Sequence, residues 1–341
     1  MIQRATPRVT ILDVAREAGV SATTVSHALN GRGQVDARTR AKVELTARRL
    51  GYRPNRHAQR LRTGEAHMIA LVSSMPFAVA GGPSRLGFLM EIAAVAAGAA
   101  LTHGLALALL PPVEGGKIAI DTIDVDGALV VEPTARDATI DTLRKRGVPV
   151  VAIGKPPGAR PRVPSIDLRS TETAELLLGH LAEVGARRIA LLVGSEKRNS
   201  YAETIAVYER LAEAREMPLR MAQIDEADGE EGGRRAMAEL LAARPDIDGV
   251  CALVDAFAVG AARAIVETGR RIPDDVRLVT RYDGVRARMH VPPLTSVDLG
   301  LEQVATQATD LLFACLGGEV KEDVILGPAP RLVVRASSAR A

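Results

Sequence analysis

The sequence predicts an α/β protein in which a small all-α head precedes a larger body of two similar halves, each a parallel sheet flanked by helices. The head is predicted because the first 54 residues contain short amphipathic segments with capping residues at their ends. The body is predicted because short apolar runs alternate with helical periods from Met68 onward. Charge divides at the same place: residues 1–65 carry 13 Lys and Arg against 5 Asp and Glu, whereas the remainder carries 31 against 36.

The stretch from Val9 to Gly31 predicts two short helices joined by a tight turn. Thr10 can cap the first helix, and Asp13 at its third position completes a capping box. Gly19 suits the left-handed position after this helix, and Ser21 can cap the second helix. Helices joined this tightly must cross steeply, which is the geometry of a helix-turn-helix. An ordinary pair of amphipathic helices in a bundle is the structural alternative.

In a helix-turn-helix, the second helix enters the major groove of DNA, and its first turns carry the side chains that reach base edges. Here those positions are Ala22, Thr23, Ser26 and His27. The basic head favours the same function, because cationic side chains neutralise phosphates and release counterions. A disordered basic arm would carry similar charge but would lack the apolar period and the caps.

The rest of the head predicts a third helix and a connecting segment. Asp36 can cap the third helix, and Gly51 ends it. Its apolar side chains are expected to pack on the first two helices: Val43, Leu45, Ala47 and Leu50. Residues 55–66 are polar, cationic and compatible with a short helix that DNA orders. A plain interdomain linker would have the same composition.

The body alternates predicted strands and helices, as in βαβ units. Its first half has apolar runs that we expect to be buried parallel strands at 69–72, 105–110, 126–131 and 148–153, with helices near 86–103 and 139–146. Its second half has apolar runs at 188–194, 248–254 and 277–283, with helices near 171–184, 201–215, 231–243 and 257–268. Small ligands bind at the carboxyl ends of such strands, so a ligand site is expected there.

Several other classes of protein are disfavoured. The N-terminus has no apolar signal core, and the run at 92–110 is broken by His103 and Gly104, so we expect a cytoplasmic protein without a membrane span. Cys251 and Cys315 lie in apolar settings without metal-ligand spacing and are expected to be reduced core residues. The sequence lacks GxSxG, P-loop and HExxH motifs, so we expect no enzyme activity, no cofactor and no metal ion.

A series of motifs carries a family resemblance. Two are highly specific, VTILDVAREAGVSATTVSHALNG and TRAKVELTARRLGYRPNRHAQRLRTG, and weaker ones follow in order: IALV, VDGALVVEP, RGVPVVAIG, HLAEVGARRIALLVG, GRRIPDDVRLVTRYD and PPLTSV. The chain therefore resembles the LacI/GalR family of bacterial transcription repressors over nearly its whole length. The resemblance implies a homodimer that binds a palindromic operator in double-stranded DNA. It also implies a periplasmic-binding-protein-like body with a small-molecule effector, a sugar or related metabolite, in the cleft between two lobes.

The resemblance also implies domain boundaries. Residues 1–54 form the head, and 55–66 form a hinge helix or linker. The N-terminal lobe takes 67–167 and about 299–323, and the C-terminal lobe takes 168–298 and about 324–341. The chain ends in RLVVRASSARA without a leucine heptad, so a dimer rather than a tetramer is expected.

Carried over position by position, the resemblance implies DNA contacts at Thr10, Ser21, Ala22, Thr23, Thr24, Ser26, His27, Asn30, Tyr52, Asn55, Gln59 and Leu61. Leu61 would be the wedge that enters the minor groove and kinks a central base step. His27 stands where the family often has arginine, and neutral histidine offers one donor at most. The core of the operator is therefore expected to differ from the commonest family sequence.

The implied effector-binding residues are Ser74, Ser84, Arg85, Phe88, Tyr201, Thr204, Asp255, Phe257 and Asp283. The alternative for each of them is that it is an ordinary loop or core residue that does not contact a ligand. Thr204 and Val254 stand where many members carry arginine and asparagine, so polar groups that hold sugars or carboxylates are missing. Arg281 replaces a usual glycine, and an ordinary hexose is not expected. A solute-binding sensor without a DNA target would explain the body equally well, but the capped basic head favours a regulator, whether repressor or activator.

Overall fold

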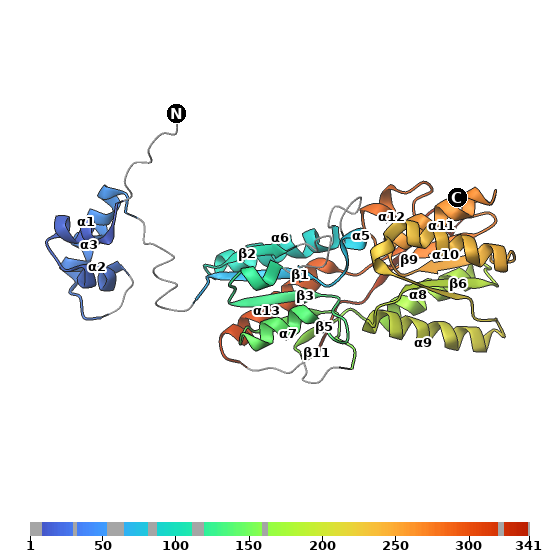
Figure 1. Ribbon diagram of the computed structural model, residues 1–341, viewed down its shortest axis with the longest axis horizontal. Coiled ribbons are helices and arrows are strands. Elements are labelled where there is room, and N and C mark those ends of the chain that lie inside the picture. The colour runs from blue at the N-terminus through green and yellow to red at the C-terminus, as the bar shows by residue number, and fades with distance from the viewer. Residues whose placement is uncertain are drawn as a thin grey trace, which may run out of the picture. The chain divides into compact units, whose positions relative to one another are not determined.

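The computed structural model describes residues 9–29, 33–52, 65–80, 87–110, 119–158, 163–319 and 324–339 (Figure 1). The chain separates into two compact units, Met1–Ala66 and His67–Ala341. The first unit is all-α and the second is α/β, as the sequence predicts. Within the described ranges, no helix has the length and apolar character needed to cross a membrane.

The head contains the three predicted helices, α1 (Ile11–Ala18), α2 (Ala22–Leu29) and α3 (Ala37–Leu50). The predicted capping box is present: the Thr10 N–H donates to the Asp13 carboxylate at 2.9 Å, and the Asp13 N–H donates to the Thr10 hydroxyl. Gly19 adopts the left-handed conformation with φ of 67°. The Ser21 hydroxyl accepts from the Thr24 N–H at 3.0 Å at the start of α2. The local chemistry of this turn is therefore as predicted.

The core of the head is a small apolar cluster. Val14, Val25 and Val43 are fully buried at its centre, one from each helix. The prediction for Leu45 is wrong, because its side chain is 70% exposed. Leu45 follows Val43 by two residues, which places it on the opposite face of a helix with 3.6 residues per turn.

The first lobe of the body is built on a six-stranded sheet with the order β11-β5-β4-β3-β1-β2. All its pairs are parallel. The strands are β1 (Met68–Ser73), β2 (Ala106–Leu110), β3 (Gly127–Val131), β4 (Val150–Ile153), β5 (Ser165–Asp167) and β11 (Val324–Leu326). α6 (Gly87–Thr102) and α13 (Leu301–Leu316) cover one face, and α7 (Ala138–Lys145) covers the other.

Two expectations for this lobe need correction. The sequence predicts a buried strand at 105–110, but among the described strands β2 pairs with β1 alone, at the edge of the sheet, and Ala106 is exposed. The chain was expected to enter the C-terminal lobe at about residue 324, but β11 still pairs with β5 of the first sheet. The final crossing between the lobes therefore follows Leu326.

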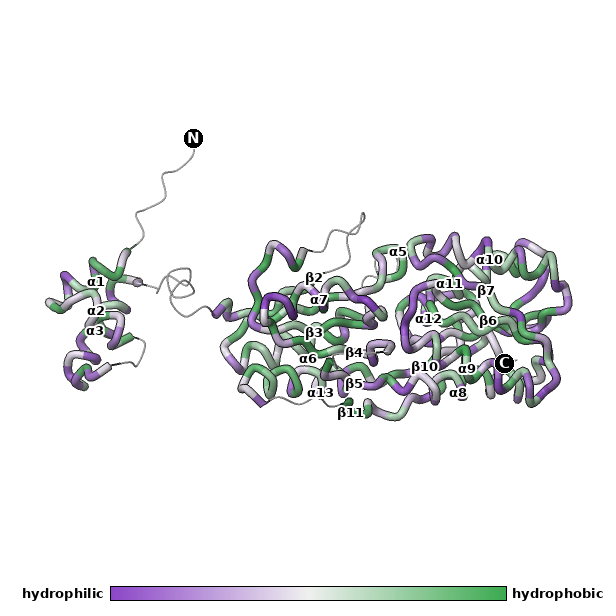
Figure 2. The backbone as a smooth tube through the Cα atoms, turned by 60° about the horizontal axis from the view of Figure 1, so that its bottom comes forward, coloured by the Kyte–Doolittle hydropathy of each residue, from purple (hydrophilic) through white to green (hydrophobic). Residues whose placement is uncertain are grey.

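The second lobe is built on a four-stranded parallel sheet with the order β7-β6-β8-β9. Its strands are β6 (Ile189–Gly194), β7 (Met221–Ile224), β8 (Gly249–Ala252) and β9 (Arg277–Thr280). The surrounding helices are α8 (Ser170–Glu183), α9 (Asn199–Ala214), α10 (Gly229–Ala243) and α11 (Asp255–Glu267). Figure 2 shows the hydrophobic colour along β6, as along β3 of the first lobe.

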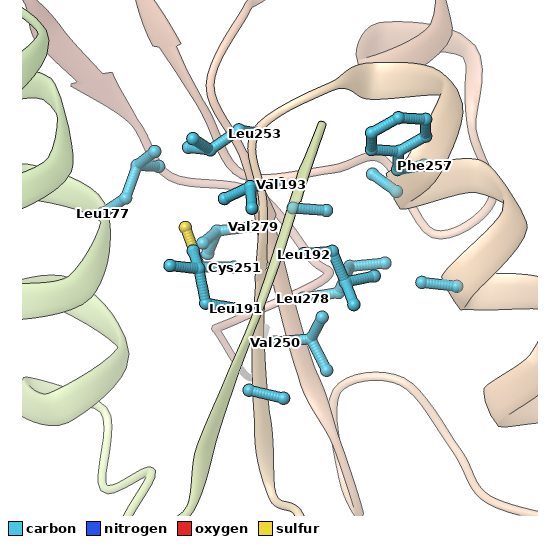
Figure 3. Packing of buried hydrophobic residues seen from close by; sticks show 14 of the residues in the cluster. Leu177, Leu191, Leu192, Val193, Val250, Cys251, Leu253, Phe257, Leu278 and Val279 are labelled. Atoms are coloured by element: carbon cyan, nitrogen blue, oxygen red, sulfur yellow. The ribbon is translucent and has the colours of Figure 1, made fainter. Parts of the chain in front are cut away.

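The core of the second lobe lies on both faces of this sheet. Figure 3 shows Cys251 on the face toward α8, which carries Leu177, and Leu192 on the face toward α11, which carries Phe257. Cys251 is a free, buried thiol, and burial raises its pKa to about 12. Cys315 is also free, but its side chain is only partly buried.

Short elements complete the body. β10 (Ser296–Asp298) and β12 (Arg331–Val333) form an antiparallel pair that holds the C-terminal segment. α5 (Phe77–Ala80) follows β1, α12 (Val285–Met289) follows β9, and the 3₁₀ turns η2 (Ala119–Thr122) and η3 (Glu226–Asp228) precede β3 and α10. The chain passes between the two sheets after β5, after β10 and after β11, so three connections join the lobes.

Candidate functional site

The head presents a polar face on α2. Val25 and Ala28 are buried in the core of the head, so the side chains of α2 that lie between them face away from the core. Thr23 is exposed, and Ser26 and His27 are partly exposed. These are hydroxyl and imidazole groups of the kind that hydrogen-bond to base edges and phosphates.

The other predicted DNA-binding residues fall into two sets. Those that the structure describes lie on the first two helices or next to the core: Thr10 and Ser21 act as helix caps, Ala22 and Thr24 are partly exposed, and Tyr52 packs against the apolar cluster. Asn30, Asn55, Gln59 and Leu61 lie outside the described residues.

The body contains a cavity of about 90 Å³ between the two lobes. Its walls come from the carboxyl ends of strands of both sheets and from α5, α6, α9 and α11. The lining residues are Ser73, Met75, Val79, Ala80, Phe88, Leu89, Val131, Glu132, Tyr201, Leu253, Val254, Asp255, Arg281 and Tyr282. The expected location of a ligand site, at the ends of the parallel strands, coincides with this interlobe pocket.

Three predicted effector residues line the interlobe pocket: Phe88, Tyr201 and Asp255. Four others do not line it. The Ser74 hydroxyl donates to Asp137 at 2.5 Å, the Thr204 hydroxyl donates to the backbone of its own helix, Phe257 is fully buried in the core, and Asp283 is held by Arg335 and Ser296. Ser84 and Arg85 lie outside the described residues.

A buried ion pair between the lobes forms one wall of the interlobe pocket. Glu132 follows β3 in the first lobe, Arg281 follows β9 in the second, and Glu132 Oε1 lies 2.7 Å from Arg281 Nη2. Both side chains are 9% exposed. Glu132 Oε1 and Arg281 Nη2 are thus paired directly, and Arg281 Nε is a buried donor without a hydrogen-bond partner. The Ser200 hydroxyl donates to the other Glu132 oxygen at 2.8 Å.

Glu132 is ionised in this setting. Burial would raise the pKa of its carboxyl, but Arg281, the Ser200 hydroxyl and Arg198 together outweigh burial and hold the pKa below its ordinary value. The backbone of Glu132 is in the left-handed region with φ of 50°. Such a conformation in a residue other than glycine is often found at ligand sites.

A second buried pair lies behind Tyr201. Arg198 Nε and Nη2 donate to the two carboxylate oxygens of Glu226 at 2.7 and 2.6 Å. The same guanidinium crosses to the first lobe, where it donates to the backbone carbonyls of Ser74, at 2.9 Å, and of Glu132. The Tyr201 hydroxyl donates to Glu226 at 2.7 Å, and burial raises the pKa of this phenol.

Arg286 pairs with Asp255, which lines the interlobe pocket. Its guanidinium, on α12, lies 3.3 Å from Asp255 and 3.0 Å from Glu230, and it donates to the carbonyl of Val79 in α5 at 2.8 Å. Burial raises the pKa of Asp255 more than Arg286 lowers it. Tyr282 adds a further link, because its hydroxyl donates to Glu91 of α6 at 2.9 Å.

Sequence reasoning missed Glu132 and Arg198, and it noted Arg281 only as a departure from the family. A signal for Glu132 was present, because this acidic residue directly follows the apolar run at 126–131. Arg198 and Arg281 pair with residues more than 20 positions away in the chain, so no local pattern identifies them. Among the residues that the structure describes, no group of three or more His, Cys, Asp or Glu side chains is arranged to hold a metal ion.

Comparison with known proteins identifies a known domain in each of the two units. Residues 10–55 match the lacI family of bacterial regulatory proteins, and residues 178–338 match the periplasmic binding protein-like domain. The HTH-type transcriptional regulator CelR of Thermobifida fusca is 32% identical over 97% of this chain and 98% of its own length.

Solved structures show the same similarity. The CelR-cellobiose complex has a TM-score of 0.69 at 29% identity and covers 97% of this chain and all of its own. The lac repressor dimer bound to operator and the anti-inducer ONPF has a TM-score of 0.77 at 25% identity and covers 98% of this chain and all of its own. The chain therefore belongs to the LacI family of DNA-binding transcription regulators.

Proposed function

We propose that this protein is a repressor that binds a palindromic operator as a homodimer and is controlled by a small molecule in the interlobe pocket. The observation that carries the proposal is the capped α1–turn–α2 unit with a polar outer face, within a head that has an excess of basic residues. Because its target is DNA, we expect the protein to act in the bacterial cytoplasm.

Two copies of α2 in a two-fold dimer would read two half-sites related by the same symmetry. The segment 55–66 would then form paired hinge helices at the operator centre, with Leu61 as the wedge. Unstacking a base step costs roughly a few kcal/mol, which extra protein–DNA contact offsets. Regulation would follow if effector binding changes how the lobes close, and thereby the spacing of the two heads.

The test is selection of bound duplexes from a random DNA pool by the full-length protein, with and without a cell metabolite extract. We expect a palindromic consensus with a deformable central step, and a change in enrichment when the extract is present. Failure to enrich any sequence under either condition would contradict the operator assignment and favour a solute-binding sensor.

Two further measurements examine the hinge and the assembly. Leu61→Ala should lower operator affinity strongly, while effector affinity stays unchanged. If operator affinity is unaffected, the hinge assignment is wrong. The mass in solution should be that of a dimer, and a tetrameric mass would contradict the assembly proposed here.

A further inference from the structure

Glu132 belongs to the first lobe but is bound to the second. It follows β3, and its N–H donates to the Ile153 carbonyl of β4 at 2.8 Å. Its carboxylate contacts two residues of the second lobe: Oε1 lies 2.7 Å from Arg281 Nη2, and Oε2 accepts from the Ser200 hydroxyl at 2.8 Å. Its backbone carbonyl accepts from Arg198, which also belongs to the second lobe. A single residue therefore connects the lobes through its carbonyl and both oxygens of its carboxylate.

The backbone conformation of Glu132 indicates that these contacts matter. Its φ of 50° lies in the left-handed region, which residues with a side chain seldom adopt. Such a conformation costs free energy and persists only where the surrounding contacts determine it. The contacts of Glu132 with the second lobe are of this kind.

The burial of the ion pair makes it different from an ordinary surface contact. Glu132 and Arg281 are both buried, so removing one of them leaves a charge without compensation. Because the two residues belong to different lobes, the remaining charge can regain water when the lobes separate, and neither lobe has to unfold. Lys155 and Glu203, which also pair across the lobes, are more exposed, so water replaces their lost contact at little cost.

We propose that Glu132 and Arg281 form an interlobe latch, an ion pair that holds the two lobes in contact through the protein's own charges and without a molecule bound between them. The body then exchanges between a latched and an open arrangement, and loss of one charge favours the open one. This inference goes beyond the proposed function. Only its consequence for DNA binding rests on that function, because the consequence requires that the lobes control the head.

Two backbone amides distinguish opening of the lobes from unfolding. The Ala135 N–H donates across the lobes to the Lys197 carbonyl at 3.0 Å. The Leu253 N–H donates to the Leu192 carbonyl at 3.0 Å, and both of these residues belong to the second lobe. Separation of the lobes should therefore release Ala135 for hydrogen exchange, whereas release of Leu253 requires disruption of the second sheet.

The first test is amide hydrogen exchange of full-length wild type and Glu132→Gln, without added ligand or DNA, followed at these two amides by mass spectrometry. In Glu132→Gln, Ala135 should exchange at least about tenfold faster than in wild type, and Leu253 should remain at least about tenfold slower than Ala135. An unchanged rate at Ala135 would show that contact between the lobes does not depend on the pair. Equal rates at Ala135 and Leu253 in the variant would show that the pair stabilises the fold and does not act as a latch.

A double-mutant cycle tests whether the two side chains act as a pair. Glu132→Gln should accelerate exchange at Ala135 at least about fivefold less in an Arg281→Met background than in wild type, because no uncompensated charge then remains. Equal accelerations in the two backgrounds would overturn the proposal.

Arg281→Met also serves alone if Glu132→Gln does not fold, because the carboxyl that it leaves can take up a proton. It should release Ala135 while Leu253 stays protected, and an unchanged Ala135 would overturn the latch. Arg263→Met is the matched control, since it alters an arginine 69% exposed on α11, and it should change neither rate.

The DNA selection described above separates the latch from the proposed function. A protein that selects a palindrome but keeps Ala135 protected in Glu132→Gln overturns the latch alone. A protein that releases Ala135 in this variant but selects no DNA supports the latch and overturns the regulator.

Discussion

His27 lies on the partly exposed face of α2, where its imidazole ring is close to Gly33. A methyl group at Gly33 would come within 2.6 Å of the His27 Nδ1 atom, so glycine leaves room for the ring at this turn. Histidine offers fewer donors than the arginine common at this position in the family, and it cannot make the bidentate contact to guanine.

We predict that His27→Ala relaxes base preference at one position in each half-site, by roughly 0.5–1.5 kcal/mol in discrimination as for a single hydrogen bond, with a smaller loss of general affinity. Arg56→Ala is the comparison: Arg56 lies in the cationic segment 55–66, where we expect a phosphate contact that contributes equally to all sequences. This variant should weaken binding to every duplex and reduce the dependence of affinity on salt. Parallel binding curves on single-base operator variants measure both effects. Indistinguishable profiles for the two variants would remove His27 from base recognition.

Glu132 gives a pH-dependent prediction for the body. Its pKa in the folded protein is below the value of 4.5 expected in an unfolded chain, so the ionised carboxylate stabilises the fold above that pH. This stabilisation decreases as the pH falls and the carboxylate takes up a proton. Glu132→Gln leaves Arg281 buried without its counter-charge and should lower the free energy of unfolding at pH 7 by about 3–5 kcal/mol.

The measurement is denaturant unfolding of wild type and Glu132→Gln from pH 7 down to pH 3. The difference between them should be largest near neutrality and should shrink below about pH 4.5, where the wild type also loses the charge. A difference that stays constant over this range would show that the charge of Glu132 does not stabilise the fold.

At the scale of single residues, sequence reasoning predicted the helix caps well and the interlobe pocket only in part. Thr10, Asp13 and Ser21 interact with atoms three residues away, so their chemistry is readable from spacing alone. Glu132 and Arg281 meet only because β3 and β9 belong to two lobes that face each other. Nothing in the local sequence fixes that approach.

At the scale of elements, the backbones of α10 and α11 pack closely against each other in the second lobe. Gly233 of α10 and Gly260 of α11 allow the backbones to approach: a methyl group at Gly233 would lie 2.5 Å from the Phe257 carbonyl oxygen, and one at Gly260 would overlap the Glu230 carbonyl oxygen. Since these neighbours are backbone atoms, they cannot move aside without displacing a helix.

We predict that Gly260→Ala destabilises the body by at least about 1–3 kcal/mol, because overpacking against backbone outweighs the helix propensity of alanine. Gly98→Ala on α6 is the control, since no atom lies within 4 Å of the added methyl group. It should be neutral or stabilise by roughly 0.5–1 kcal/mol. Thermal unfolding of both variants tests the contact, and equal melting temperatures would contradict it.

The elements that sequence reasoning found and missed differ mainly in length. Helices such as α8 and α9, with 14 and 16 residues, show several turns of apolar period and were predicted within a few positions. The strands β5, β10, β11 and β12 have three residues each, which is too short for any period, and none was predicted. These segments become strands because they pair with strands distant in the chain, as β11 pairs with β5.

At the scale of the whole body, the lobes are held together by charged groups at several places around the interlobe pocket. Arg198 donates to backbone carbonyls of the first lobe, and Arg286 donates to the carbonyl of Val79 in α5, which follows β1. Lys155, which follows β4 (Val150–Ile153), contributes another link: its ammonium lies 2.8 Å from Asp167 and 2.8 Å from Glu203 of α9 in the second lobe. The lobes are thus in direct contact at these places, and an effector that opens them must break these contacts.

Lys155→Met removes one interlobe link without touching the lining of the interlobe pocket. The Lys155 side chain is 30% exposed, so the loss should be near the upper end of the range for exposed pairs, about 1 kcal/mol, and should favour opening of the lobes. Because an effector bound between the lobes favours closure, its affinity should fall by about two- to fivefold. Lys145→Met, an exposed lysine at the end of α7, is the control and should change nothing.

Linkage extends this prediction to DNA. If lobe closure couples the interlobe pocket to the head, the effector and the operator must alter each other's affinity by the same factor, typically 5- to 150-fold. Lys155→Met, which favours the open lobes, should then shift operator affinity of the ligand-free protein in the direction opposite to the shift that the effector causes. This holds whether the effector releases or promotes DNA binding, and titrations of operator with and without effector measure both shifts. Shifts of the same sign would show that control of the head does not pass through closure of the lobes.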